Sequence, residues 1–393
     1  MTVVAAAANA HSHAFHRVLR GRTHDEGGSF WTWRDLMYRA AAVLDPGLYP
    51  ELAEAVFAEM LVAGYTAVGE FHYVHHRPDG TPYADPNAMG AALAAAAESV
   101  GIRLTLLDTC YLASAPGAAL LPEQARFGDG SPGAWLDRWH ALAPLASDLV
   151  TIGAAVHSVR AVSPEGIGAI VAGLPAEVPL HIHLSEQPAE NAQSLAAFGL
   201  TPTGVLAEAG ALAPRLSVVH ATHLTDGDIA ALGAAGVTAV ICPTTEADLG
   251  DGIGPARELA DAGAVIAIGS DQHVVIDPFL EVRGLEAGER LRSLARGRFT
   301  PAELEAARTD GGFRALGVAD HTRDTVTLDA ASVRTAGAAP DQLAYAATAA
   351  DVREVAVGGV VVARDGMLAD GRDPARMLST AIAKIDARLK VSR

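Results

Sequence analysis

Cysteine, basic residues and aromatic residues are all scarce in this sequence. The two cysteines, Cys110 and Cys242, are far apart and form no CxxC pair, which argues against a disulfide framework or a thiolate metal site. Lys and Arg number 29 against 46 Asp and Glu, and the net charge is −17. Because no basic run is interleaved with aromatic residues, we expect no nucleic-acid partner.

Long apolar runs are also missing. The alanine-rich stretch 91–97 is followed by Glu98 and is too short to cross a bilayer, and the N-terminal residues lack the basic region of a signal peptide. We therefore expect a cytoplasmic protein that does not associate with membranes.

What the sequence does contain is a series of short apolar, β-rich runs, most of them followed by a segment with helical periodicity. Helices are expected at 49–63, 87–100, 164–172, 187–198 and 225–235. Buried parallel strands are expected at eight places, which are 3–8, 66–70, 103–107, 151–156, 180–183, 216–220, 237–242 and 265–269. Eight strands alternating with helices are typical of a (β/α)8 TIM barrel. A doubly wound sheet is the alternative, but no GxGxxG or Walker sequence supports it.

The regular pattern ends near Gly317. We predict a barrel over 1–317, a small β module over 318–372 with strands near 325–329 and 355–362, and a C-terminal helix within 373–393. Two long connections, 21–39 and 112–133, are expected to be loops that wall a pocket.

Polar side chains collect at the ends of the predicted strands, where a barrel carries its active site. His11 and His13 face the same way on the first strand, His183 follows on the fifth, and Asp271 follows the eighth. Three histidines and one aspartate suit a single Zn²⁺, with Fe²⁺ or Mn²⁺ as alternatives.

Two further residues at these ends can move protons. Glu186, three residues after His183, is the expected acid and base, and its other interpretation is a carboxylate at a helix N-terminus. His220, after the sixth strand, is the expected base or electrostatic partner of a bound water.

Three more residues are candidates for substrate contacts. Arg160 and Arg34 are able to hold carboxylates in bidentate fashion, although either alone is more often a surface residue. Tyr73 can donate a hydrogen bond, although a tyrosine at a sheet end is usually packing.

The motifs that contain these residues resemble those of the formimidoylglutamate deiminases, which belong to the amidohydrolase superfamily. The resemblance spans nearly the whole predicted barrel. It is carried by Asn9-Ala-His-Ser-His-Ala-Phe, Ser29-Phe-Trp-Thr-Trp-Arg-Asp-Leu-Met-Tyr-Arg, Glu70-Phe-His-Tyr-Val-His-His, His157-Ser-Val-Arg-Ala-Val, His181-Ile-His-Leu-Ser-Glu-Gln, Val219-His-Ala-Thr-His-Leu, Cys242-Pro-Thr-Thr-Glu-Ala-Asp-Leu-Gly-Asp-Gly-Ile and Gly269-Ser-Asp-Gln-His.

The resemblance implies a TIM barrel with a small β-sandwich that hydrolyses N-formimidoyl-L-glutamate to N-formyl-L-glutamate and ammonia, in histidine degradation. It implies one Zn²⁺ on the four ligands named above, catalytic roles for Glu186, His220 and Asp271, and a homodimer. It also places around the substrate His16, Arg34, Tyr73, His157 and Arg160.

Three positions differ from the family pattern. His16 stands where the family usually has Gln, Asp108 lies in an altered strand end, and Gln272 replaces the usual Ser. The chain also starts only a few residues before His11, so we expect the small β-sandwich to lack its N-terminal strands. These differences keep open the same chemistry on another formimidoyl, guanidino or amide-bearing acid. A third reading is a ligand-binding barrel without catalysis.

Overall fold

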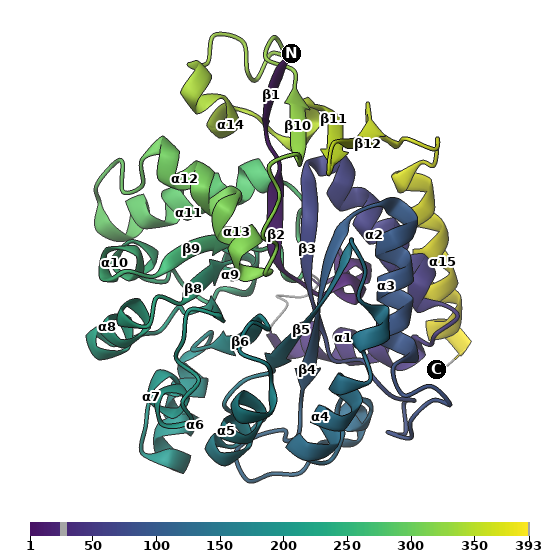
Figure 1. Cartoon of the computed structure of the whole chain (residues 1–393), viewed down its shortest axis with the longest axis vertical. Coiled ribbons are helices and arrows are strands. Elements are labelled where there is room, and N and C mark those ends of the chain that lie inside the picture. The colour runs from purple at the N-terminus through teal and green to yellow at the C-terminus, as the bar shows by residue number, and fades with distance from the viewer. Residues whose placement is uncertain (24–29, 392–393) are drawn as a thin grey trace.

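A computed structural model describes residues 1–23 and 30–391 of the protein. Its centre is an eight-stranded parallel sheet in which the strands are neighbours in chain order (Figure 1). The strands are β2 (Ala7–Ser12), β3 (Tyr65–His72), β4 (Arg103–Cys110), β5 (Val150–Val156), β6 (Leu180–Leu184), β7 (Leu216–His220), β8 (Thr238–Ile241) and β9 (Val265–Ile268). The predicted (β/α)8 barrel is therefore confirmed, and the doubly wound alternative is wrong.

The first predicted strand is divided in two. Residues 3–8 were expected to form one barrel strand, but β1 (Thr2–Ala5) pairs antiparallel with β10 (Thr325–Leu328), and only β2 enters the barrel. The alternating exposure of β1 marks a strand with one covered face, whereas every residue of β2 is buried. The apolar run alone could not reveal that its two halves belong to different sheets.

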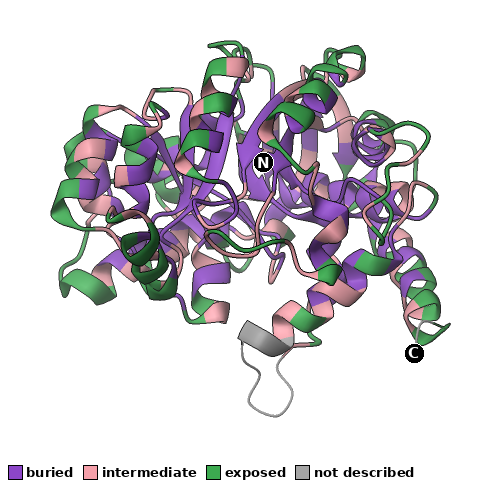
Figure 2. Ribbon diagram, turned by 90° about the horizontal axis from the view of Figure 1, so that it is seen from below, coloured by how far each residue is buried: buried purple, intermediate pink, exposed green. Residues whose placement is uncertain are grey.

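Helices cover the outside of the barrel and carry exposed residues on their outer faces (Figure 2). Proline at the first turn, preceded by a Ser or Thr cap, begins several of them; Ser163 and Thr201, for example, each accept a hydrogen bond from a backbone N–H three residues on. The helices of the barrel are α2 (Tyr49–Ala63), α3 (Ala88–Val100), α4 (Pro132–His140), α5 (Pro164–Gly173), α6 (Pro188–Phe198), α7 (Pro202–Glu208), α8 (Asp226–Ala234), α9 (Pro243–Leu249), α10 (Ala256–Ala262), α11 (Pro278–Ser293), α12 (Pro301–Arg308) and α13 (Asp310–Ala315).

The long connection after β2 is not the loop that we expected. Its residues 24–29 lie outside the described residues, and Phe30–Val43 forms a helix, α1. The second long connection, 112–133, is mostly irregular and contains a 3₁₀ helix, η2 (Pro122–Phe127).

The remaining chain forms a five-stranded antiparallel sheet of order β1-β10-β11-β12-β13 beside the barrel (Figure 1). Its other strands are β11 (Val352–Val357), β12 (Val360–Arg364) and β13 (Met367–Leu368), and the short helix α14 (Leu343–Ala346) precedes β11. The last helix, α15 (Pro374–Val391), packs on α2. The expected division at residues 317 and 372 stays a prediction, and β1 places residues 2–5 in the small sheet. No helix within the described part of the chain is both long and apolar enough to cross a membrane.

Candidate metal and catalytic centre

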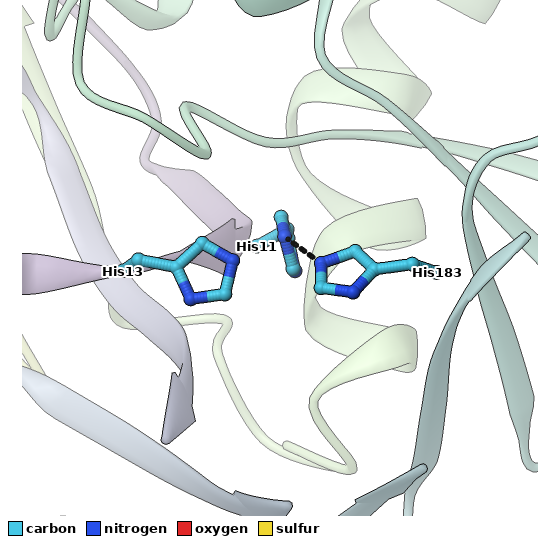
Figure 3. A group of neighbouring side chains, drawn as sticks. All are labelled: His11, His13 and His183. Atoms are coloured by element: carbon cyan, nitrogen blue, oxygen red, sulfur yellow. Dashed lines mark hydrogen bonds between the residues drawn. The ribbon is translucent and has the colours of Figure 1, made fainter. Parts of the chain in front are cut away.

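Three imidazole rings and one carboxylate meet at the carboxyl end of the barrel. The rings of His11, His13 and His183 point toward one another (Figure 3), and the Nε2 atoms of His11 and His183 are 3.1 Å apart. Oδ1 of Asp271 is 3.4 Å from Nε2 of His11 and 3.4 Å from Nε2 of His13. The structure thus brings together all four of the predicted metal ligands.

The outer nitrogens of two of these rings have fixed partners. Nδ1 of His13 donates to the carbonyl of Phe71, and Nδ1 of His183 donates to the carbonyl of His157, each over 2.9 Å. A neutral imidazole that donates through Nδ1 carries its lone pair on Nε2, which here faces the centre.

The charge states of the four groups also suit a cation. Burial lowers the pKa of His11, His13 and His183 and so keeps their rings neutral, as ligation requires. Burial acts to raise the pKa of Asp271, but the hydrogen bond from His11 and the charge of His220 outweigh burial and hold that pKa below its usual range. Nitrogen and oxygen donors of this kind, converging on one point, fit a divalent cation such as zinc.

Three of the four ligands, His11, His13 and Asp271, lie on the seam where the barrel closes. The carbonyl of His11 accepts hydrogen bonds from the backbone N–H groups of Ser270 and Asp271, each over 3.0 Å, and the N–H of His13 donates to the carbonyl of Asp271 over 3.2 Å. Between the two histidines, the Ser12 hydroxyl donates to Glu70 over 2.7 Å. The positions of three ligands are therefore set by the backbone bonds that join the first and last strands.

His220 lies beside this ligand set and faces three carboxylates. Its Nε2 is 3.8 Å from Oδ2 of Asp271 and 3.8 Å from Oε1 of Glu186, and its Nδ1 is 3.3 Å from Oε1 of Glu246. Burial would lower the pKa of His220, but the Glu186 charge and the Glu246 hydrogen bond outweigh burial and raise that pKa to about 10. Burial also raises the pKa of Glu186. A histidine and a carboxyl group, both with raised pKa values, are thus placed side by side beside the ligand set.

The backbone is strained at the same strand ends. Among residues other than glycine, φ is 69° at His220 and 40° at Asp271, and Ser185, Ala221 and His273 are also in the left-handed region. Such conformations cost roughly 1–3 kcal/mol each and persist where the surroundings fix them, often at functional sites. Here they turn His220 and Asp271 toward the metal ligands.

A cavity opens above the ligands and is lined by every predicted substrate-binding residue, namely His16, Arg34, Tyr73, His157 and Arg160. His16 is buried in the 3₁₀ helix η1 (Ala14–Leu19), its Nε2 is 3.2 Å from the Tyr73 hydroxyl, and burial lowers its pKa to about 3. Arg34 comes from α1, and Arg160 follows β5. The cavity therefore combines two guanidinium groups with neutral hydrogen-bonding rings.

Two of the three unusual positions do not line this cavity. Asp108 is fully buried on β4 and receives both Nη1 and Nη2 of Arg138, at 2.7 and 2.9 Å. Gln272 donates to Asp248 over 2.9 Å. Our interpretation of Asp108 and Gln272 as signs of an altered pocket is corrected, because their side chains are used in internal contacts. His16 alone of the three faces the substrate space.

Several residues of the centre and of its cavity escaped the sequence analysis. Glu246 follows β8 within the motif that begins at Cys242, and its position at a strand end was the available signal. Tyr38, Tyr111 and Gln124 also line the cavity. They come from α1, the end of β4 and η2, and nothing in the local sequence indicates that these segments meet.

Comparisons with known proteins agree with this geometry. Residues 2–322 match the amidohydrolase family. A formimidoylglutamate deiminase of Pseudomonas aeruginosa is 39% identical over 96% of this chain and 88% of its own length. A 5-methylthioadenosine/S-adenosylhomocysteine deaminase of Halobacterium salinarum is 27% identical over 91% of this chain and 80% of its own length.

Solved structures give the same result. An amidohydrolase from Brucella melitensis has a TM-score of 0.90 and 34% identity, covering 98% of this chain and 89% of its own. An adenosine deaminase from Xanthomonas campestris with bound zinc has a TM-score of 0.81 and 25% identity, covering 99% of this chain and 86% of its own. The resemblance inferred from the motifs is therefore confirmed.

Proposed function

The chain belongs to the amidohydrolase family, and on that premise we propose that it is a zinc-dependent deiminase of N-formimidoyl-L-glutamate. The reaction adds water to the formimidoyl C=N bond and yields N-formyl-L-glutamate and ammonia. The observation that carries this proposal is the placement of Glu186, His220 and Asp271 beside the three histidines, under a cavity that also holds two arginines.

A cation held by His11, His13, His183 and Asp271 would lower the pKa of a water molecule and polarise the C=N bond. The protein groups then handle the protons. Asp271 accepts a proton as the water oxygen attacks the formimidoyl carbon, and His220, which its raised pKa keeps protonated, stabilises the charge that develops. Glu186 passes this proton, and a second one that the hydroxyl of the adduct releases as its C=O bond forms, to the terminal nitrogen, so that the C–N bond to this nitrogen breaks and ammonia leaves.

The two arginines would bind the carboxylates of the substrate. N-formimidoyl-L-glutamate carries two carboxylates, and a guanidinium binds a carboxylate through two parallel hydrogen bonds. Arg34 comes from the connection after β2 and Arg160 from the connection after β5, and both line the cavity. Together they would hold the substrate so that its formimidoyl carbon lies over the ligand set.

A second candidate is the same reaction on a different small acid. It is favoured by His16, which faces the cavity where the family usually has Gln and whose ring meets the Tyr73 hydroxyl. A neutral imidazole offers one donor and one acceptor, whereas an amide offers two of each. Histidine in place of glutamine at position 16 therefore changes which substrate groups can be bound at this wall of the cavity.

The test is ammonia release by the zinc-loaded protein with N-formimidoyl-L-glutamate and a panel of other N-formimidoyl, guanidino and amide-bearing acids. We expect the glutamate compound to be turned over, and we expect Glu186→Gln and removal of the metal by a chelator each to abolish turnover. Turnover of another compound alone would favour the second candidate. No ammonia release from any compound of the panel would contradict both candidate functions and would leave a binding protein.

This activity would place the enzyme in histidine degradation, in the cytoplasm, with a small-molecule substrate and without a nucleic-acid or membrane partner. We further expect a homodimer in solution. Light scattering tests this expectation, and a monomeric mass would contradict it.

A further inference from the structure

A single buried amide joins two tyrosines at the wall of the cavity. The side-chain amide nitrogen of Gln124 is 2.9 Å from the hydroxyl of Tyr38 and 2.9 Å from the hydroxyl of Tyr111. Gln124 and Tyr111 are buried, Tyr38 is half-buried, and all three line the cavity. None of the three is among the residues assigned to substrate in the proposed function.

The orientation of this amide is determined by the backbone. The N–H of Leu121 donates to Oε1 of Gln124 over 2.9 Å. Because a backbone N–H can only donate, the amide oxygen must face Leu121 and the NH₂ group must face the tyrosines. Both phenol oxygens are therefore acceptors from Gln124.

A phenol that accepts in this way still has its own hydrogen to donate. The charges of Arg34 and Arg160 both reach the two phenols, where they act to lower the pKa of Tyr38 and Tyr111 against the stronger, raising effect of burial. An anion placed between the arginines is thus within the field of two O–H donors as well. The guanidinium of Arg34 also lies 5.4 Å from the centre of the Tyr38 ring, which links the two directly.

The distance of the tyrosines from the ligand set indicates which end of the substrate they meet. The ring of Tyr111 is 4.1 Å from that of His157, which is 5.1 Å from that of the metal ligand His183. The side-chain carboxyl carbon of an extended N-formimidoyl-glutamate is five bonds, roughly 6 Å, from its formimidoyl carbon. The ring of His157 thus lies between Tyr111 and the ligand His183, and this separation suits the remote side-chain carboxylate of the substrate.

We propose that Tyr38 and Tyr111 are specificity-determining residues that donate hydrogen bonds to the side-chain carboxylate of the substrate, and that Gln124 is the positioning residue that orients them. This inference rests on the proposed function and deepens it. It explains why three segments far apart in sequence converge on one amide: their meeting point selects acids with a second carboxylate.

The test compares N-formimidoyl-L-glutamate with N-formimidoyl-L-norvaline, which keeps the α-carboxylate and the chain but lacks the second carboxylate. The ratio of the two kcat/KM values is measured for the wild type, Tyr38→Phe, Tyr111→Phe and Gln124→Glu. Each Tyr→Phe change should lower the preference for the glutamate compound by about tenfold, mainly through KM, because a hydrogen bond to a charged group is lost.

Gln124→Glu should lower that preference at least as far. Its carboxylate keeps the bond from Leu121 but accepts the phenol hydrogens, so that they no longer point to the substrate. Tyr345→Phe, in α14 and outside the cavity, is the matched control and should leave the preference at the wild-type value. Melting temperatures of all variants establish that they are folded.

The outcomes separate the two proposals. Turnover of the glutamate compound by the wild type, with preferences in the cavity variants equal to that of Tyr345→Phe, would overturn this inference alone. Equal losses on both compounds would overturn it too, since they would indicate a structural role. Absence of wild-type turnover would overturn the proposed function and this inference with it.

Discussion

Replacing Asp108 by asparagine should reveal a residue that supports the fold and leaves substrate choice unaffected. Both oxygens of Asp108 are used: Oδ2 accepts from Nη1 of Arg138 over 2.7 Å, and Oδ1 accepts from Nη2 over 2.9 Å and from the indole of Trp135 over 2.9 Å. Asparagine has the same shape, but one of its ends is an NH₂ group that faces an arginine N–H instead of accepting from it.

The size of the effect follows from the burial of the pair. Breaking one partner of a buried ion pair destabilises a protein by about 3–5 kcal/mol. Arg138 also contacts Asp129, at 2.7 and 3.0 Å, so its charge stays partly compensated in the variant. We therefore expect Asp108→Asn to lower the free energy of unfolding by about 2–3 kcal/mol.

The assay is urea unfolding at pH 7, followed by circular dichroism and combined with KM for the glutamate compound. Glu354→Gln is the matched control, because Glu354 pairs with Arg364 on the solvent-exposed face of the small sheet and such pairs contribute little. Asp108→Asn should unfold at lower urea than the control, with an unchanged KM. A free energy of unfolding no lower than that of Glu354→Gln, or an altered substrate preference, would refute the reasoning.

Three further predictions concern the barrel ends. Gly269→Ala places a Cβ only 2.8 Å from Cβ of His11, so that this ligand must shift, and we expect a lower metal content after dialysis, measured by atomic absorption. Glu246→Gln removes the anion beside Nδ1 of His220, and we expect kcat to fall about tenfold or more. Burial raises the pKa of Glu281 from 4.5 to about 8. The contribution of Glu281 to the free energy of unfolding is therefore complete below pH 4.5 and is lost as the pH rises through about 8. Glu281→Gln should flatten this fall of the free energy of unfolding with pH, measured by urea unfolding at a series of pH values.

Each of these changes has a control and a contrary result. Gly168→Ala, where the added Cβ meets only an ordinary contact at 3.7 Å, should keep its metal, and equal retention by Gly269→Ala would contradict the crowding argument. Glu123→Gln is the surface control for kcat, and a rate equal to it in Glu246→Gln would contradict a role for that anion. The same pH slope in Glu281→Gln and the wild type would contradict the assignment of the slope to Glu281.

Local pattern was sufficient to predict most of the barrel. Tyr49–Ala63 was predicted and found with the same bounds, because its apolar periodicity and the glycine that ends it, Gly64 at φ 103°, are both local signals. The ligand histidines were equally visible, since alternate residues of a strand face the same way. What failed at residues 3–8 was the assignment of one apolar run to a single sheet, because pairing depends on residues more than 300 positions away.

The missed parts of the site share one physical cause. Tyr38, Tyr111 and Gln124 meet only through the fold of two long connections, and their contacts carry no spacing rule. Asp108 was misread because its departure from the family pattern at a strand end suggested an altered pocket, but its partner Arg138 lies 30 residues on and turns it inward. Predictions from sequence were therefore better for residues on strands than for residues on the connections between them.

The passage of one short segment from the small sheet into the barrel has a mechanical consequence. β1 is hydrogen-bonded along its length to β10, only Ala6 separates it from β2, and β2 carries His11. The side chain of Arg308 also donates to the carbonyl of Ala5, just before that junction. A displacement of the small sheet should therefore move β1, which is paired along its whole length, and through β2 the metal ligand His11. The two sheets should consequently melt as one cooperative unit, and damage to the outer sheet should be felt at the centre of the barrel.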